Sequence, residues 1–366
     1  MSGKRKNIAV VAVLAVLVGA FSLACLLKPA DAVSDSERRP LAQQPELSAQ
    51  SVLSGAYMER FDAYAVDQFP LREQFRELYA FMSSKVFLRA DVEGLYLKDG
   101  AIVAKEYPLD EESLEHASQV FSGVCDTYLQ ESAGRIFLAI VPDKAYFHQG
   151  DPSMLVMDYE ALFSRMEALN PQMRRIDIAP LLSADDYLAT DPHWRQECIG
   201  DVADCIASAL DVSLSCDFAF GEATADFRGT YAGQAALPIR PERLMYAMSP
   251  ALEDVRVFDH QNNREMPLYD MAKLDGRDPY EMYLGGPLSY VTIENPAAPP
   301  DKELIVFRDS FGSALVPYLA SGYGKVTVLD IRYLPSASLG SFVDFHGQDV
   351  LFLYSTSVLN NSETLK

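Results

Sequence analysis

The chain has 366 residues, 49% of them hydrophobic, which is enough to bury the core of one large α/β domain with additions or of two domains. Its formal net charge is −21, from 52 acidic and 31 basic residues. Binding to nucleic acid depends on clustered lysine and arginine, so this composition argues against a nucleic-acid partner and is typical of a solvated, self-repelling surface.

The N-terminal segment carries basic residues at positions 4–6, followed by an uncharged apolar run over residues 8–27. The run is long enough to cross a membrane as a helix, and the basic flank is expected to stay in the cytoplasm. An Ala-x-Ala sequence that ends at Ala32 also fits a signal-peptidase site, so residues 1–32 are either a membrane anchor or a cleaved signal peptide. In both cases we expect residues 33–366 to be extracytoplasmic, either anchored to the membrane or secreted.

The next two segments lead into the main domain. Residues 33–55 are rich in Ser, Gln, Ala, Glu and Pro, which is typical of a tether. Residues 56–100 form a mainly helical segment, because Pro70 suits a first helical turn and the apolar residues of positions 71–86 repeat at helical spacing. The Asp-Gly pair at 99–100 predicts a hairpin at its end.

From residue 101 to residue 366 helical and strand patterns alternate, which is typical of a mostly parallel sheet covered on both faces. Short apolar runs predict its strands at residues 136–141, 175–178, 304–307, 325–329 and 350–354. Residues 211–300 break this rhythm and are interpreted as an insertion that shapes the substrate cleft.

Four cysteines follow the apolar run, at positions 125, 198, 205 and 216, and they allow three pairings among which the sequence does not choose. Cys198 and Cys205 share one helical face about 10 Å apart, too far to bridge each other. The alternative is that the thiols are buried as small hydrophobic groups. The histidines and cysteines lack metal-ligand spacing, so neither a metal nor another cofactor is predicted.

Ser310 follows the buried run 304–307 and precedes a helix-like segment that begins with Phe311 and Gly312. A serine there lies at the carboxyl edge of the sheet, where open α/β folds bind ligands. The first N–H groups of the helix, from Phe311 or Gly312, are candidates to stabilise an oxyanion. The alternative is that Ser310 only caps the helix.

Asp191 and His193 are two residues apart, so in an extended segment their side chains emerge on one side. Pro192 keeps Asp191 away from helical dihedral angles. Together with Ser310 the pair can form a Ser-His-Asp site, in which the acid orients the imidazole and the other ring nitrogen accepts the serine proton. The alternative is that Asp191 caps the next helix and His193 packs at its start.

Two basic residues are further candidates for contact with the substrate. Arg308 lies two positions before Ser310, and Lys144 follows the strand 136–141. Each has the charge to bind an anionic sugar, and each also has a structural alternative, which for Arg308 is an ion pair with a neighbouring acid.

Five segments of the chain, taken in order, resemble those of the DHHW family of bacterial exported proteins, which is similar to the alginate O-acetyltransferase group of SGNH hydrolase-like proteins. These segments are Val66–Arg72, Val141–Lys144, Thr190–Trp194, Leu284–Gly286 and Phe307–Gly312.

This resemblance implies a three-layer α/β/α SGNH hydrolase-like fold over residues 101–366. It implies that Ser310 is a nucleophile, His193 its base and Asp191 the residue that orients the base. The implied reaction transfers an acyl group, which is acetyl in the acetyltransferase relatives. The implied acceptor is a cell-surface polysaccharide, and a membrane protein is a candidate for delivering the acyl group.

The chain departs from the family pattern at two prolines. Pro192 replaces the first histidine of Asp-His-His-Trp, and Pro287 follows Gly286 where relatives commonly have Asn. Proline has no hydrogen-bond donor, and the loss of one oxyanion donor costs about 3 kcal/mol of transition-state stabilisation. Two hypotheses follow, a serine O-acyltransferase or acyl esterase, and a non-catalytic glycan-binding or envelope-assembly protein that kept the fold.

Overall fold

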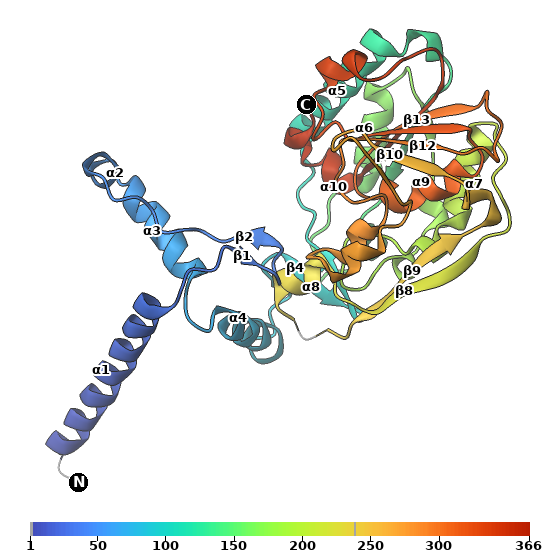
Figure 1. Cartoon of the computed structure of the whole chain (residues 1–366). Coiled ribbons are helices and arrows are strands. Elements are labelled where there is room, and N and C mark those ends of the chain that lie inside the picture. Colours follow the sequence, from blue (N-terminus) through green and yellow to red (C-terminus); the bar gives the residue numbers. More distant parts are fainter. Residues whose placement is uncertain (1–2, 238) are drawn as a thin grey trace. The chain divides into compact units, whose positions relative to one another are not determined.

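The computed structural model describes residues 3–237 and 239–366, and the chain divides into two compact units (Figure 1). The smaller unit comprises the described residues of Met1–Arg89 and Gly233–Pro238. The larger unit comprises Ala90–Ala232 and the residues from Ile239 to Lys366. The larger unit therefore begins ahead of the boundary at residue 101 that the sequence predicts.

The smaller unit consists mainly of helices. Its elements are α1 (Gly3–Leu27), β1 (Val33–Ser34), β2 (Arg39–Pro40), α2 (Ala49–Leu53), α3 (Ala56–Asp67), α4 (Arg72–Phe81) and the π-helical turn η1 (Met82–Val86). Helix α1 contains a candidate membrane span, Arg5–Cys25, by length and composition. This candidate span includes most of the apolar run, residues 8–27, that was identified in the sequence.

Part of the predicted tether is folded against the end of α3. Arg39 donates two hydrogen bonds to the Asp67 carboxylate, at 2.9 and 2.7 Å, and the Ala42 amide donates a third at 2.8 Å. The hydrogen bond from Arg39 is the main cause that lowers the pKa of Asp67 to about 2. Residues 39–42, within the predicted tether 33–55, are therefore held in place by hydrogen bonds in this unit.

The larger unit is built on an eight-stranded sheet. In their side-by-side order its strands are β11 (Arg264–Met266), β10 (Arg256–Asp259), β12 (Tyr290–Glu294), β14 (Lys325–Leu329), β13 (Glu303–Arg308), β15 (Asp349–Ser355), β6 (Ile136–Val141) and β7 (Arg174–Ile176). The five strands from β14 to β7 are parallel, and β12, β10 and β11 extend the sheet in antiparallel pairing. The mostly parallel sheet is thus confirmed.

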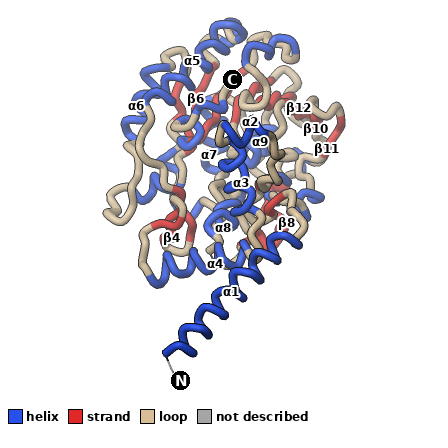
Figure 2. The backbone as a smooth tube through the Cα atoms, turned by 90° about the vertical axis from the view of Figure 1, so that its left-hand side faces the viewer, coloured by secondary structure: helices blue, strands red, loops and turns tan. Residues whose placement is uncertain are grey.

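Helices cover both faces of this sheet (Figures 1 and 2). The covering helices are α5 (Glu111–Tyr128) and α6 (Tyr159–Leu169) on one face, and α7 (Gly200–Ala209) and α9 (Gly312–Ala320) on the other. Because side chains alternate along a strand, Phe137 and Ala139 of β6 pack with α7 and α9, whereas Leu138 packs with α5 and α6. Two hydrophobic cores, one on each face, produce the three-layer arrangement.

Further short elements complete the secondary structure of the chain. They are the antiparallel sheet β3 (Asp91–Val92), β4 (Leu95–Lys98) and β5 (Ala101–Ala104), the hairpin β8 (Ala219–Phe227) and β9 (Glu242–Met248), and the short helices α8 (Thr230–Ala235) and α10 (Thr356–Leu359). The predicted insertion at 211–300 therefore supplies strands β10, β11 and β12 of the main sheet, besides the β8–β9 hairpin. All five cysteines are free thiols.

Candidate active site

Ser310 lies in a short turn between the end of β13 and the start of α9. Asp309 fixes this turn, because one of its carboxylate oxygens accepts from the Phe311 amide at 3.0 Å and the other from the Ser355 amide at 2.7 Å. Asp309 is fully buried, so these charge-assisted hydrogen bonds are shielded from water. Strand β13 and the neighbouring strand β15 thereby hold the serine at the carboxyl edge of the sheet.

Asp191, His193 and Ser310 form a chain of hydrogen bonds. The Nδ1 atom of His193 is 2.5 Å from Oδ1 of Asp191, and its Nε2 atom is 2.7 Å from Oγ of Ser310. Asp191 is fully buried and His193 is 8% exposed. With the Nδ1 proton directed at the carboxylate, Nε2 is the acceptor for the serine hydroxyl proton, which is the arrangement that activates a serine as a nucleophile.

The segment that carries the histidine is joined directly to the serine turn. The indole nitrogen of Trp194, which is fully buried, donates to the Phe311 carbonyl at 3.1 Å. On the other side, the Thr230 amide donates to Oδ2 of Asp191 at 2.8 Å. Asp191 and Trp194, which lie on either side of His193 in this segment, are therefore each fixed by a further hydrogen bond.

The acid of this chain is supported by a close backbone contact. A side chain at Gly229 would place its Cβ 2.3 Å from the Cβ of Asp191 and 2.4 Å from the Thr190 carbonyl. The Gly229 amide donates to the Thr190 hydroxyl at 2.9 Å, and that hydroxyl donates to Glu242 at 2.7 Å. Residue 229 must therefore be glycine for the two segments to approach this closely.

Two aromatic rings enclose the imidazole. The ring of Tyr280 is stacked on His193, with centroids 4.0 Å apart and planes at 10°, and the ring of Phe311 lies 5.0 Å away. Tyr280 is 4% exposed, and no described residue is hydrogen-bonded to its hydroxyl. Tyr280 could not be predicted from the sequence, because a tyrosine in an irregular segment of a chain with 19 tyrosines has no distinguishing pattern.

The two amides predicted to stabilise an oxyanion already donate within the turn. The Phe311 amide donates to Asp309, and the Gly312 amide donates to the Asp309 carbonyl at 3.1 Å. Among the hydrogen bonds of the described residues, none has the amide of Ser310 or of Gly285 as its donor. The available amide nearest to the serine oxygen is therefore that of Ser310 itself.

Arg308 is fully buried and points into the protein, away from solvent. Its guanidinium donates to the Gly286 carbonyl at 3.1 Å and to the Asp309 carbonyl at 3.4 Å, and it lies 3.7 Å from the Asp330 carboxylate. Burial lowers the pKa of this group, and the nearby Asp330 opposes that effect. Arg308 thus joins the Gly285–Gly286 turn to the serine turn. These contacts fit a structural role, which was the alternative to binding an anionic sugar.

Lys144 is also buried, with 4% of its surface exposed. Its Nζ atom donates to the Leu188 carbonyl at 3.0 Å and lies 5.1 Å from the centre of the Tyr231 ring. Burial lowers the pKa of Lys144 to about 8, and the charges of Asp191 and Glu242 oppose that effect. It is therefore placed behind the acid of the site, where a soluble substrate does not reach it.

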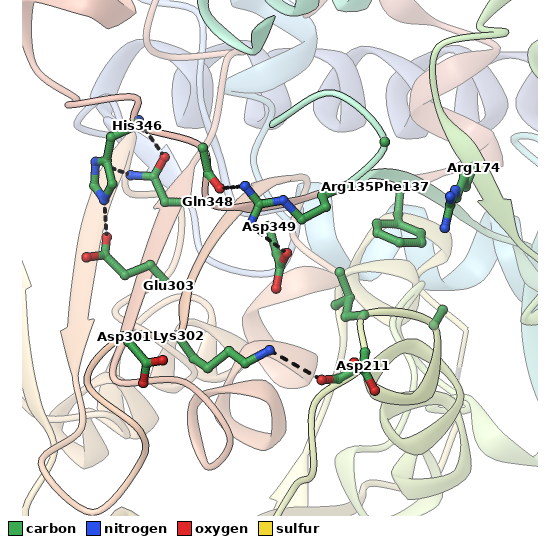
Figure 3. Close-up of a pocket in the computed structure, with 14 residues that line it drawn as sticks. Arg135, Phe137, Arg174, Asp211, Asp301, Lys302, Glu303, His346, Gln348 and Asp349 are labelled. Carbon is green, nitrogen blue, oxygen red and sulfur yellow. Dashed lines mark hydrogen bonds and ion pairs between the residues drawn. The ribbon is translucent and has the colours of Figure 1, made fainter. Parts of the chain in front are cut away.

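A polar cavity of about 480 Å³ lies at the opposite edge of the sheet, where β6, β13 and β15 begin (Figure 3). Among the residues that line it, Arg135 lies 3.8 Å from Asp349 and His346 lies 3.5 Å from Glu303. None of the predicted site residues lines it. Within residues 3–237 and 239–366, no group of three His, Cys, Asp or Glu side chains is placed to hold a metal ion.

Comparison with known proteins gives matches among solved structures. The chain is similar to a DHHW family protein from Eubacterium siraeum, with a TM-score of 0.57 and 17% identity over 74% of this chain and 93% of that one. It is similar to PatB1 from Bacillus cereus, with a TM-score of 0.59 and 16% identity over 72% of this chain and 96% of that one. The structure of PatB1 with a sulfonyl adduct gives a TM-score of 0.58 at 17% identity, over 72% and 97% of the two chains.

No protein-family model and no curated protein matches the chain. The structural matches cover most of both proteins and confirm the three-layer α/β/α SGNH hydrolase-like fold. They also confirm the resemblance to the DHHW family at the level of the fold. At this identity the likeness defines the fold alone, and activity has to be argued from the site.

Proposed function

We propose that the chain is an extracytoplasmic serine O-acyltransferase, with acetyl as the acyl group and a hydroxyl of a cell-surface polysaccharide as the acceptor. If water replaces that acceptor, the same site is an acyl esterase. The observation that carries this proposal is the hydrogen-bond chain from Asp191 through His193 to the hydroxyl of Ser310. A serine that only caps a helix does not need a buried imidazole and carboxylate behind it.

The reaction has two halves. In the first, Oγ of Ser310 attacks the acyl carbonyl while Nε2 of His193 accepts the hydroxyl proton, and the leaving group departs with that proton. In the second, Nε2 accepts the proton of the acceptor hydroxyl, whose oxygen attacks the acyl-serine. Ser310 then recovers its proton from His193, and Asp191 stabilises the imidazolium in both halves.

The oxyanion of each tetrahedral intermediate needs donors, and we assign the Ser310 amide as one of them. The Gly285 amide is a second candidate, because Arg308 ties the adjacent Gly286 carbonyl to the serine turn. Amides held by such buried contacts need little reorganisation during the reaction. Phe311 and Gly312 then keep the turn in shape, in place of the oxyanion role that the sequence suggested.

The N-terminal helix supports the proposed location of the protein. The candidate span Arg5–Cys25 has a mean hydropathy of 2.8, which fits an anchor or a signal and an extracytoplasmic site. A membrane protein that delivers the acyl group is therefore a candidate partner, and a polysaccharide outside the cytoplasm is the proposed acceptor.

A non-catalytic glycan-binding or envelope-assembly protein is the second candidate function. It is favoured by Pro287, which is exposed next to Gly286 and brings no donor to a place where relatives commonly have Asn. This candidate predicts glycan binding that is unchanged when both Ser310 and His193 are replaced by alanine.

The first experiment is hydrolysis of 4-nitrophenyl acetate by the full chain in detergent, beside Ser310→Ala and His193→Ala. The proposal predicts release of 4-nitrophenol that falls by about 1,000-fold or more in both variants. An acetylated glycan acceptor, detected by mass spectrometry, then separates transfer from hydrolysis. Full activity in Ser310→Ala would defeat the proposal, and glycan binding without any turnover of the parent protein would favour the second candidate.

A further inference from the structure

Helix α4 and the turn η1 carry their apolar side chains on the outside. Leu71, Phe75, Leu78 and Val86 repeat at helical spacing, and they are 59%, 45%, 53% and 52% exposed. A surface helix of a globular protein has the opposite arrangement, with its apolar stripe packed on the core and its polar residues in water. We call these four residues, together with Phe69, the apolar stripe.

The inner face of α4 is small and polar. Ala80 and Ser83 are buried, and Arg76 donates to the carbonyls of Gly233 and Gln234 at 2.9 and 2.8 Å. These contacts fix the rotation of the helix about its axis. The outward direction of the stripe is therefore a property of the folded unit.

The stripe is continuous with the candidate membrane span of α1. The ring of Phe21 in α1 is stacked on Phe69, with centroids 5.6 Å apart and planes at 10°, and it lies 6.2 Å from the ring of Phe75. Both α1 and α4 belong to the smaller unit, so this contact lies within one compact body. The aromatic cluster connects the two helices.

The position of Phe21 sets the depth of the stripe relative to a bilayer. Phe21 is four residues before the end of the span at Cys25, which corresponds to about 6 Å along a helix axis. Amphipathic helices that lie in the membrane interface bury their apolar faces by about 5–10 Å, and aromatic side chains concentrate at that level. Phe69 and Phe75 are thus at the depth of the interface when α1 spans the membrane.

We propose that the apolar stripe is a lipid-binding surface that lies in the extracytoplasmic interface of the membrane spanned by α1. The exposed side chains of Lys85 and Arg89 follow at the end of the helix, where they meet anionic lipid headgroups. This second, in-plane contact holds the smaller unit against the bilayer and restricts the tilt of α1. The proposal is independent of the acyltransferase assignment.

Tryptophan fluorescence tests this proposal in the full chain. The chain has one tryptophan, Trp194, which is fully buried and gives a constant background. Phe75→Trp places a reporter in the stripe, and Glu77→Trp places a matched control on an exposed polar position of the same helix. Each variant is reconstituted as one protein per nanodisc of phosphatidylcholine and phosphatidylglycerol, with and without bromine on the acyl chains.

We expect brominated lipid to lower the added emission of Phe75→Trp about two-fold or more and to leave Glu77→Trp unchanged. Leu78→Trp repeats the measurement one turn further along α4. Val13→Trp, in the span, shows that the discs quench. Quenching of Val13→Trp without quenching at 75 and 78 would overturn the proposal and indicate that a protein partner, absent from these discs, covers the stripe. Equal quenching at 75 and 77 would also overturn it, because the face of the helix would then not matter.

Discussion

At the scale of single residues, Nε2 of His193 lies 2.7 Å from the hydroxyl oxygen of Ser310 and is the acceptor for its proton. The imidazole cannot turn freely, because its Nδ1 atom is bonded to Asp191 and the other oxygen of that carboxylate already accepts from Thr230. Tyr280 covers one face of the ring. These contacts hold the imidazole in the orientation that general-base catalysis requires.

The stacked ring at position 280 gives a prediction for kinetics. Tyr280→Phe keeps the ring and should retain at least about half of kcat/KM for 4-nitrophenyl acetate, whereas Tyr280→Ala should lower it about 10-fold or more by loosening the imidazole. The two variants are compared in the same esterase assay, with thermal unfolding as a check of folding. Equal loss in both would point to the phenol hydroxyl in place of the ring, and no loss in either would remove Tyr280 from the site.

At the scale of elements, two segments 117 residues apart form the site, and each is supported by a loop that contributes no proposed catalytic side chain. Residues 229 and 230 pack against Asp191, and the Gly285–Gly286 turn is joined to the serine turn by Arg308. The site therefore depends on backbone approach and on a buried cation as well as on its three side chains.

A methyl group at Gly229 tests the close approach. Gly229→Ala should lower the free energy of unfolding by about 2 kcal/mol or more and abolish most of the activity, because the new Cβ would overlap Asp191. Gly123→Ala is the matched control, since that glycine is inside α5 with open space around its Cβ. Replacing it should be neutral or stabilise the helix by up to about 1 kcal/mol. Urea unfolding measures both, and a Gly229→Ala protein as stable and active as the parent would contradict the packing.

The buried guanidinium of Arg308 gives a second prediction at this scale. Arg308→Met removes the donors of the Gly286 and Asp309 carbonyls, so the free energy of unfolding should fall by about 3 kcal/mol. Arg243→Met breaks an exposed ion pair with Glu222 and should cost less than about 1 kcal/mol. If chemical denaturation gives similar values for both arginines, the role of Arg308 as a joint between two turns is wrong.

At the scale of the whole molecule, the parallel sheet brings the ends of β6, β13 and β15 to one edge. The buried carboxyl group of Asp143 and the partly buried one of Glu106 lie beside the end of β15. Asp143 accepts from the hydroxyls of Tyr159 and Thr356 at 2.7 Å each, and Glu106 accepts from Ser357 at 2.7 Å. Burial, followed by the charge of Asp143, raises the pKa of Glu106 from 4.5 to about 7. The folded protein therefore keeps a proton on Glu106 at a pH where the unfolded chain has lost it.

This linkage predicts how stability depends on pH. Because the folded-state pKa is raised, the contribution of Glu106 to stability falls as pH rises from about 4.5 to about 7 and stays low above that. Glu106→Gln should thus equal the parent near pH 4.5 and exceed it at pH 8 by up to about 3 kcal/mol, since each tenfold change in proton affinity is worth about 1.4 kcal/mol. Denaturant titrations at the two pH values measure this, and a variant less stable than the parent at pH 8 would contradict the assignment.

The sequence was a good guide where local pattern decides the structure. Mostly apolar runs identified β6, β13, β14 and β15, because strands buried on both faces leave few polar positions. The Asp191–x–His193 spacing likewise placed two side chains together, since it depends on two neighbouring residues. Antiparallel strands β10 to β12 were missed because polar and apolar residues mix in them and their pairing partners are distant in sequence.

Features that arise only in three dimensions were not predictable. The contact of Tyr280 with His193 joins residues 87 positions apart, and no spacing rule links them. The hydrogen bond that the Phe311 amide donates to Asp309 depends on the conformation of one turn. From the sequence we could predict only that a helix starts there. The role of Arg308 could not be predicted either, because its contact with the Gly286 carbonyl joins residues that are distant in sequence.

Sulfonyl labelling tests whether Ser310 is a nucleophile that His193 activates. The full chain is treated with phenylmethylsulfonyl fluoride, so that the serine oxygen displaces fluoride, and the adduct is located by tandem mass spectrometry in the parent and in His193→Gln. We expect an adduct on Ser310 that forms at least about 100-fold more slowly in His193→Gln, because the glutamine side chain cannot accept the serine proton. No adduct on Ser310, or the same rate in both proteins, would contradict it.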